Sequence, residues 1–198
     1  MRGSKMKHSS RIVAVMVLLA GSCVAQMKDV PPPPKPADEG PSLQVTMKFI
    51  QEKIENVGPV NFVAYYHDNI AGNDWAVQFM NQISKVSADP STCRIDYHLY
   101  LQRAGQRVFD LDKWIGLKDI VNIEVMPLSQ DFKGLSTKQG HPSWDNRIDP
   151  PVFGLYAEGE KIGRHYFEFS DEQMADRVAK ALQHAVELCG GGTKPEPF

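Results

Sequence analysis

CRIDYHLYL, residues 93–101, alternates apolar and polar side chains along its length. Its odd-numbered residues are all apolar, and most of its even-numbered residues are polar. This two-residue period is typical of a β-strand that buries one face and exposes the other. The stretch therefore predicts a strand in a sheet that covers a hydrophobic core.

Weaker alternation recurs on both sides of this strand. The other six segments with this pattern are 60–67, 75–87, 106–114, 121–128, 151–158 and 161–169. Turn-forming sequences separate them, such as GND at 72–74 and EGE at 158–160, as expected for consecutive antiparallel strands. We therefore expect seven antiparallel strands. Residues 75–86 stay open to a second assignment, because their large apolar residues also recur at the four-residue spacing of a helix.

A helix is expected at each end of the strand region. Ser42 is a suitable N-cap, and apolar residues then recur every three or four positions until Gly58-Pro59 ends the pattern. At the other end, Ser170 and Gln173 form a capping-box pair, and an apolar stripe continues through residues 171–189 to a run of glycines. The order helix, strands, helix places the chain in the α+β class.

This order of elements, from residue 60 to residue 189, resembles the pleckstrin-homology-like barrel in sequence of elements and in length. The resemblance implies a bent seven-stranded antiparallel sheet or partly open barrel, capped at one end by the C-terminal helix. Members of that superfold that bind phosphoinositides use a basic loop between the first two strands. Residues 68–74 read DNIAGND here. That departure argues against inositol phosphates as ligands.

The chain also contains DPSTC at 89–93, DPPVF at 149–153 and HAVELCGG at 184–191. These segments resemble a family of uncharacterised exported proteins from soil bacteria. The resemblance implies export and indicates no particular activity.

The first 25 residues have the three parts of a secretory signal peptide: basic residues, an apolar run from Ile12 to Ala20, and small residues before a cleavage point. The apolar run is shorter than the roughly 20 residues that span a bilayer. Cleavage before Gln26 is one interpretation. The other is a lipobox, LAGSC at 19–23, with a lipid anchor on Cys23. We expect an exported protein without an integral membrane span, either periplasmic, secreted or anchored as a lipoprotein.

Three further regions follow the signal peptide. Residues 26–40 include PPPPKP at 31–36 and have the composition of an extended proline-rich linker. Residues 41–192 have the size of a single globular domain. Residues 193–198 are expected to be a disordered tail.

Cys93 and Cys189 are the cysteines that remain outside the signal region. An exported protein meets oxidising conditions, so the pair predicts a disulfide. The alternative is two buried thiols. A catalytic thiol needs a positively charged and partly exposed setting, which neither sequence context provides.

The chemistry of the 198-residue chain excludes several classes of function. Signal removal takes away four of the 22 basic residues and none of the 24 acidic ones, so the formal charge changes from −2 to −6. Nucleic acid is therefore an unsuitable partner. The sequence contains no hydrolase motif or phosphate-binding loop, and we expect no cofactor and no metal. The nearest approach to a metal site is the set His67, Asp68 and His98, if the first and third strands adjoin.

Residues 129–149 form the longest stretch without clear periodicity, and loops of this length are often functional. His141, Trp144, Asn146 and Arg147 combine an aromatic ring with hydrogen-bond donors, as interface centres do. Trp144 could equally anchor the loop to the domain.

Two functions follow from these patterns. The leading hypothesis is a non-catalytic exported binding module, for a protein, peptide or envelope ligand, carried on the proline-rich tether. The alternative is an exported hydrolase with an active site near residues 129–149, built from His141, Asp145 and their neighbours.

Overall fold

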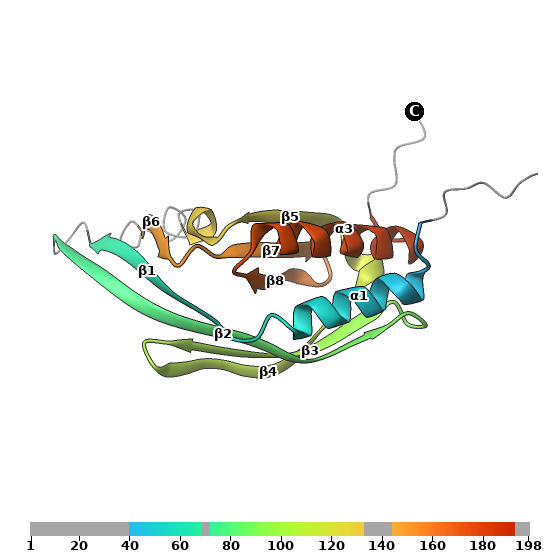
Figure 1. The fold of residues 1–198 in the computed structure, drawn as a ribbon, viewed down its shortest axis with the longest axis horizontal. Coiled ribbons are helices and arrows are strands. Elements are labelled where there is room, and N and C mark those ends of the chain that lie inside the picture. Colours follow the sequence, from blue (N-terminus) through green and yellow to red (C-terminus); the bar gives the residue numbers. More distant parts are fainter. Residues whose placement is uncertain (1–39, 69–71, 133–143, 193–198) are drawn as a thin grey trace, which may run out of the picture. The chain divides into compact units, whose positions relative to one another are not determined.

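The computed structural model describes residues 40–68, 72–132 and 144–192. Its main elements along the chain are α1 (Leu43–Glu55), β1 (Val60–Asp68), β2 (Asn73–Asp89), β3 (Arg94–Arg103), β4 (Gln106–Gly116), the 3-10 turn η1 (Leu117–Asp119), β5 (Asn122–Pro127), β6 (Trp144–Asp149), β7 (Phe153–Gly159), β8 (Gly163–Phe169) and α3 (Glu172–Leu188) (Figure 1). The chain is therefore α+β with a helix at each end, as predicted. The expected signal peptide, the linker up to residue 39 and the tail 193–198 lie outside the described residues.

The strands form two antiparallel sheets. Sheet A has the order β4-β3-β2-β1-β6, and sheet B has the order β5-β7-β8. The expected single bent sheet or partly open barrel of seven strands is therefore wrong, because the described strands number eight and are divided between two sheets. The additional strand is β6, which lies within the segment expected to be a loop and pairs with β1.

The ambiguous segment 75–86 is a strand. It lies within β2, which has 17 residues and pairs with β1 on one side and β3 on the other. Its alternate residues Phe79, Asn81 and Ile83 are buried, while the residues between them are more exposed. A strand between two hydrogen-bonded neighbours has partners for its backbone amides and carbonyls on both sides. The two-residue period of a strand therefore applies to residues 75–86, and the helical spacing does not.

The main core lies between the helices and the two sheets. α1 packs against β2 and against α3, and α3 also packs against all three strands of sheet B (Figure 1). The following large side chains of this core are completely or almost completely buried: Met47, Ile50, Ile95, Ile115, Leu155, Phe167, Phe169 and Leu182.

Both helices begin with a side-chain cap. Ser42 precedes α1 and accepts a hydrogen bond from the Val45 amide, as predicted. At α3 the cap is Asp171, which accepts from the Gln173 amide at 3.0 Å, so the expected capping residue Ser170 is wrong by one position. An acidic cap also suits the positive end of the helix dipole.

A disulfide joins Cys93, just before β3, to Cys189 at the end of α3, 96 residues apart in sequence. Both residues are buried. The bond agrees with the prediction and is compatible with an exported protein. Within the described part of the chain, no helix has the length and apolar character that a membrane span requires.

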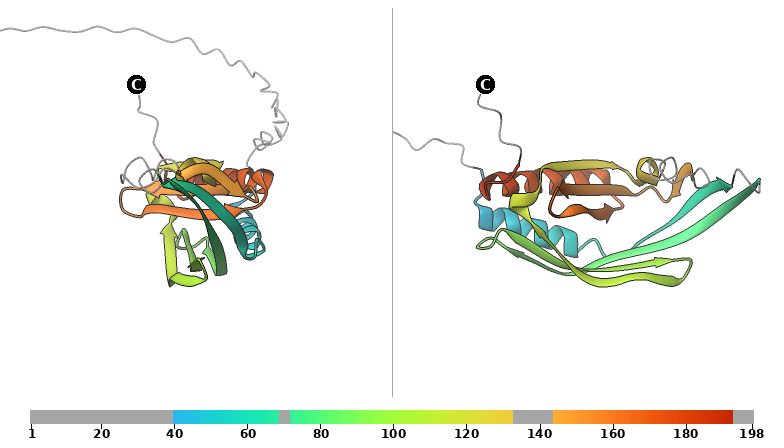
Figure 2. Two further views of the ribbon diagram at one scale, coloured as in Figure 1. Left: turned by 90° about the vertical axis from the view of Figure 1, so that its left-hand side faces the viewer. Right: turned by 180° about the vertical axis from the view of Figure 1, so that it is seen from behind.

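Beyond the main core, β1 and the first half of β2 continue as a two-stranded arm, with β6 alongside β1 (Figure 1, Figure 2). A second hydrophobic cluster lies at its base, and its buried members are Val60, Phe62, Ala64, Phe79, Leu128 and Val152.

Candidate functional site

The arm carries aromatic side chains along one face. At its base, Phe62 of β1 and Phe79 of β2 lie opposite each other, with ring centroids 5.1 Å apart. Four residues further out on each strand, and on the same face, Tyr66 stacks on Trp75 with centroids 6.4 Å apart and planes 11° from parallel. Trp75 is 49% exposed, so the aromatic row continues from a buried base to a solvent-accessible end.

β6 brings a third aromatic residue to this end of the arm. Trp144 is the register partner of Tyr66, and Arg147 is the register partner of Tyr65, with a register shift between the two pairs. Trp144, Tyr66 and Trp75 therefore occupy neighbouring positions on β6, β1 and β2. We name these three positions the arm surface; Trp144 is placed in it by its backbone.

The base of the arm is fixed by packing. The ring of Phe132 lies 6.4 Å from that of Phe62 and 5.7 Å from that of Phe79. Phe132 follows β5 in a helical turn at residues 128–132. This packing ties the base of the arm to the chain that leaves sheet B, so the arm surface rests on an ordered aromatic cluster.

The structure partly assembles the residues that the sequence singled out for binding. Trp144, Asn146 and Arg147 all lie on β6, beside the arm. The guanidinium of Arg147 lies 3.7 Å from the centre of the Tyr65 ring, a cation–π contact. His141 lies outside the described residues. Asp145, named for the alternative hydrolase, is also on β6.

Tyr65, Tyr66 and Trp75 were missed by the sequence analysis as site residues. Tyr66 and Trp75 fall within the segments 60–67 and 75–87, which were expected there as ordinary alternating strands. Tyr66 lies opposite Trp75 because Asp68 pairs with Asn73. The turn expected at 72–74 is centred too late in the sequence to give this register, so it could not have identified the pair.

No family model, curated protein or solved structure matches this chain. The similarity to exported bacterial proteins therefore stays a prediction, and so does any relation to the pleckstrin-homology superfold. The arm surface is interpreted from its own chemistry.

His98 lies between two aspartate side chains on sheet A. Its Nε2 lies 3.1 Å from Asp110, and its Nδ1 lies 2.8 Å from Asp112. The metal set considered from the sequence needed β1 beside β3, but β2 lies between them, so that premise is wrong. The residues that the structure describes contain no group of three metal-ligating side chains with suitable geometry.

His165 and Tyr97 connect the two sheets. His165 Nε2 lies 3.0 Å from the carbonyl of Ile162, so this nitrogen carries the proton and donates it. Nδ1 then accepts from the Tyr97 hydroxyl at 2.9 Å. Burial lowers the pKa of His165, and the charge of Lys113 lowers it further. Because both ring nitrogens are engaged, the pair serves as a structural link and not as a free base.

Arg164 organises the acidic groups on sheet B. It forms ion pairs with Asp131 at 2.6 Å and with Glu158 at 2.8 Å, and it lies 3.9 Å from the centre of the Tyr156 ring. Burial raises the pKa of Tyr156, and it raises that of the neighbouring Tyr166 to about 12. The carboxylate of Asp131, at the start of the segment 129–149, is thus neutralised by a cation.

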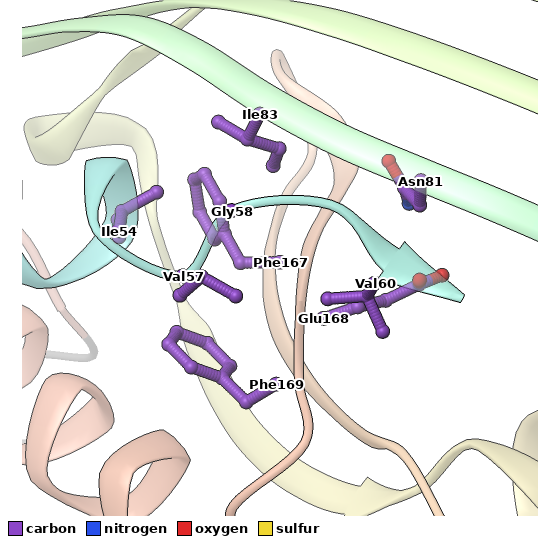
Figure 3. Close-up of a pocket in the computed structure, with 9 residues that line it drawn as sticks. All are labelled: Ile54, Val57, Gly58, Val60, Asn81, Ile83, Phe167, Glu168 and Phe169. Carbon is purple, nitrogen blue, oxygen red and sulfur yellow. The ribbon is translucent and has the colours of Figure 1, made fainter. Parts of the chain in front are cut away.

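Glu168 and Asn81 are buried polar residues beside a small cavity. Figure 3 shows their polar ends on the same side, beside Val60, while apolar side chains line the rest. The cavity measures about 10 Å³, about the space of one water molecule. Both amide atoms of Asn81, and Oε2 of Glu168, have no hydrogen-bond partner of normal geometry in the described structure. The cavity is too small for an organic substrate.

Burial raises the pKa of Glu168 to about 7, Asn81 opposes this in part, and Asp131 adds to it. The neutral carboxyl is therefore favoured in the fold. The favourable contribution of the neutral Glu168 carboxyl to folding is fully present below a pH near the ordinary pKa of 4.5. This contribution is lost as the pH rises through 7.

Replacing Glu168 with glutamine should remove this loss. A pKa of about 7 in place of 4.5 corresponds to about 3 kcal/mol. We expect the free energy of unfolding of Glu168→Gln, minus that of the wild type, to grow by this amount between about pH 4.5 and pH 8. His165 favours folding as the pH rises, but it is common to both proteins and cancels in the difference.

Urea unfolding at the two pH values measures the effect. Glu160→Gln, at an exposed position in the turn between β7 and β8, controls for the change in net charge. A difference between Glu168→Gln and the wild type that stays constant with pH would show that Glu168 is ionised in the fold at little cost.

Proposed function

We propose that the protein is a non-catalytic exported binding protein that holds a polypeptide partner on the arm surface. The observation that carries the proposal is the half-exposed Trp75 stacked on Tyr66, next to the backbone position of Trp144. Large apolar side chains at the surface mark interaction sites when they gather with other aromatic groups.

The residue types support a protein partner. Tryptophan, tyrosine and arginine are the residues that most often dominate the binding energy of protein interfaces. Tyr66, Trp75 and Trp144 hold neighbouring register positions at this end of sheet A, while Tyr65, with Arg147 against its ring, lies on the opposite face. Tyrosine and tryptophan rings are rigid and supply contact area at a low cost in conformational entropy.

The charge of the protein constrains its partner. Asp74 precedes Trp75 on β2, and the exposed Asp149 ends β6. The expected mature chain also has a formal charge of −6 once the four basic residues of the signal region are removed. Complementary charge therefore favours a partner that presents basic side chains around an apolar centre.

The alternative hydrolase receives less support. An active site needs several titratable groups within reach of one another in a cleft. In the described parts of the chain, His98, His165 and Arg164 are engaged with their neighbours, and Glu168 borders a cavity the size of a water molecule. His141 falls outside the described residues, so the hydrolase hypothesis rests on Asp145 and the sequence pattern.

Export and tethering are part of the same proposal. The buried disulfide is compatible with an oxidising compartment. The signal-like residues 1–25, followed by a proline-rich segment, support release or anchoring of the domain at the cell envelope, with Cys23 as the candidate lipid attachment point.

Trp75→Ala should weaken binding while leaving the fold intact. Peptides are selected from a random phage-displayed library on the wild-type protein, and one selected peptide is synthesised and titrated. We expect its Kd to rise at least about 30-fold for Trp75→Ala, as for an interface hot spot of about 2 kcal/mol. The urea midpoint should stay close to the wild-type value, because Trp75 is half exposed.

Trp114→Ala is the matched control. Trp114 is 51% exposed, as Trp75 is, but it lies on β4 at the other edge of sheet A from β6. We expect this variant to bind the selected peptide with wild-type affinity. Equal binding by both variants and the wild type would exclude the arm surface as the site.

A further inference from the structure

β4 leaves one edge of sheet A open in the described structure. It pairs with β3 on one side and is the first strand of the order β4-β3-β2-β1-β6 (Figure 1). It has 11 residues, and the apolar Val108 and Phe109 on it are exposed. A register shift beside these two residues leaves residues 109–116 as the regular part of the edge. A long edge strand of this kind is a template on which another extended chain can pair.

The pairing within sheet A fixes which backbone groups of β4 face the open edge. The Ala104 amide donates to the Gln78 carbonyl at 2.8 Å, in the same register as the β2–β3 pairs. Alternate residues of an antiparallel strand direct both backbone groups to the same neighbour. Even-numbered residues of β3 therefore face β2, and odd-numbered residues face β4. Asp110 and Asp112 lie opposite even-numbered residues of β3, so they direct their amides and carbonyls to the open edge.

A groove with a volume of about 400 Å³ lies beside the regular part of this edge. β4 forms one wall, with Leu111 and Lys113, and the turn between β7 and β8 forms the other, with Lys161 and Ile162. This volume is in the range of ligand-binding clefts. An added strand would direct every second side chain into the groove, on the same face as Leu111 and Lys113.

Lys113 gives the groove a positive charge without a counter-ion. It is half-buried, and it takes part in none of the ion pairs among the described residues. Burial lowers the pKa of His165 in the same groove, and the charge of Lys113 lowers it further. Lys161, on the opposite wall, pairs with Asp119 at 3.4 Å. A half-buried ammonium group without a carboxylate partner favours a ligand that brings one.

The outer face of β4 carries the opposite charge. Asp112 precedes Lys113 on the strand, so its side chain points to the other face of the sheet, where it is exposed beside His98. An added strand alternates its side chains in the same way. The complementary sequence therefore places an acidic residue opposite Lys113 and a basic residue opposite Asp112.

These charges argue against a second copy of the chain as the occupant. Two copies of β4 paired antiparallel about a two-fold axis bring residues equally far from the axis opposite each other. An axis at Leu111 places Asp110 opposite Asp112 twice, and an axis at Asp110 or Asp112 places that aspartate opposite its own copy. Like charges directly opposite each other destabilise strand pairing.

We propose that the open edge of β4 binds a different polypeptide as an added antiparallel strand, with an acidic residue facing Lys113 and a basic residue facing Asp112. Backbone hydrogen bonds to Asp110 and Asp112 hold the extended chain, and the two charges select its sequence. This site is separate from the arm surface, because β4 and β6 are the opposite edges of sheet A.

A designed peptide tests this strand on the full chain as isolated. The acetylated and amidated peptide Thr-Glu-Lys-Val-Thr-Val, read against β4 from residue 114 back to residue 109, places its glutamate opposite Lys113 and its lysine opposite Asp112. By NMR we expect saturating peptide to slow amide exchange of Asp110 and Asp112 at least about tenfold. The amides of Leu111 and Lys113, which face β3, serve as internal references.

The control peptide Thr-Lys-Glu-Val-Thr-Val has the same composition with the two charges exchanged. We expect its Kd to be at least about tenfold higher. Lys113→Gln should raise the Kd of the first peptide by a similar factor. Lys180→Gln removes the same charge from an exposed position on α3 and should leave this Kd unchanged. The urea midpoints of both variants report on their folding.

Four results would overturn the proposal. The first is no binding of the designed peptide at millimolar concentration, and the second is equal affinity for the two peptides. The third is binding without slower exchange at Asp110 and Asp112, which would place the peptide elsewhere on the protein. The fourth is slow exchange of these two amides without peptide that disappears on dilution, which would assign the edge to a second copy of the chain.

Discussion

Replacing Cys93 and Cys189 together with alanine should lower the free energy of unfolding by about 4–5 kcal/mol. The disulfide closes a loop of 96 residues of sequence separation. A cross-link of that span restricts the unfolded chain strongly, and the chain-entropy relation gives about 4.7 kcal/mol for a loop of about 100 residues. The bond joins the start of β3 to the end of α3, so it also holds the last helix to sheet A.

The local structure around Cys93 supports a large effect. Cys93 has a φ of 53°, in the left-handed region that non-glycine residues seldom adopt. Its carbonyl accepts from the Leu117 amide at 2.9 Å, and Asp89 holds the preceding turn by accepting from Ser91 and Thr92. Removal of the disulfide leaves this backbone conformation with fewer restraints.

Urea unfolding with and without reductant measures the contribution. The wild-type protein should lose stability on reduction, while the double alanine variant should not respond to reductant at all. A loss of less than about 1 kcal/mol in the variant would mean that the unfolded chain stays compact around the two cysteines.

The strands that could be predicted are those with one buried face. In β3, Ile95, Tyr97 and Leu99 are buried between more exposed neighbours. Burial along this strand therefore follows the alternation of apolar and polar residues in the sequence. β6 could not be predicted in this way. The sequence WDNRID has no regular alternation, and its strand conformation comes from pairing with β1 at the edge of sheet A. Pairing over such a distance in sequence leaves no local pattern.

The division into two sheets was also beyond the sequence. Periodicity shows which side chains face inward, but it does not show which strands share a sheet. The chain passes from sheet A to sheet B at η1, Leu117–Asp119, and returns to sheet A for β6 before it completes sheet B with β7 and β8. The expected single sheet of seven consecutive strands does not include this return of the chain to sheet A.

Only some residues of the candidate site were predicted from the sequence. Trp144 and Arg147 were selected because an aromatic residue and a donor stood together in an aperiodic segment. Their structural neighbours Tyr65, Tyr66 and Trp75 lie about 70–80 residues earlier and belong to strands that looked purely structural. What distinguishes Trp75 is its exposure at the end of the arm, and exposure depends on where the packed core stops.

The apolar stripe expected on the last helix is only partly correct, because Val178, Leu182 and Ala185 are buried whereas Leu188 is 49% exposed. The buried part of the stripe carries the second large effect. The fully or almost fully buried residues of α3 are Ala175, Val178, Leu182, Ala185 and Val186. Leu182 lies near the middle of this stripe, with no exposed surface, in the core shared by both helices and both sheets. α3 also contacts α1 and every strand of sheet B, so this side chain lies where the layers meet.

Leu182→Ala should therefore lower the free energy of unfolding by about 2–5 kcal/mol, through lost burial and the cavity that remains. Leu188→Ala on the same helix is the matched control, because Leu188 is 49% exposed and the same truncation there should change stability by less than about 0.5 kcal/mol. Urea unfolding of both variants with the disulfide intact isolates the packing contribution from that of the cross-link. If Leu182→Ala costs less than about 1 kcal/mol, α3 is held to the domain by the Cys93–Cys189 bond and not by its apolar face. In that case the disulfide alone attaches α3 to the domain, and the double cysteine variant should release the helix entirely.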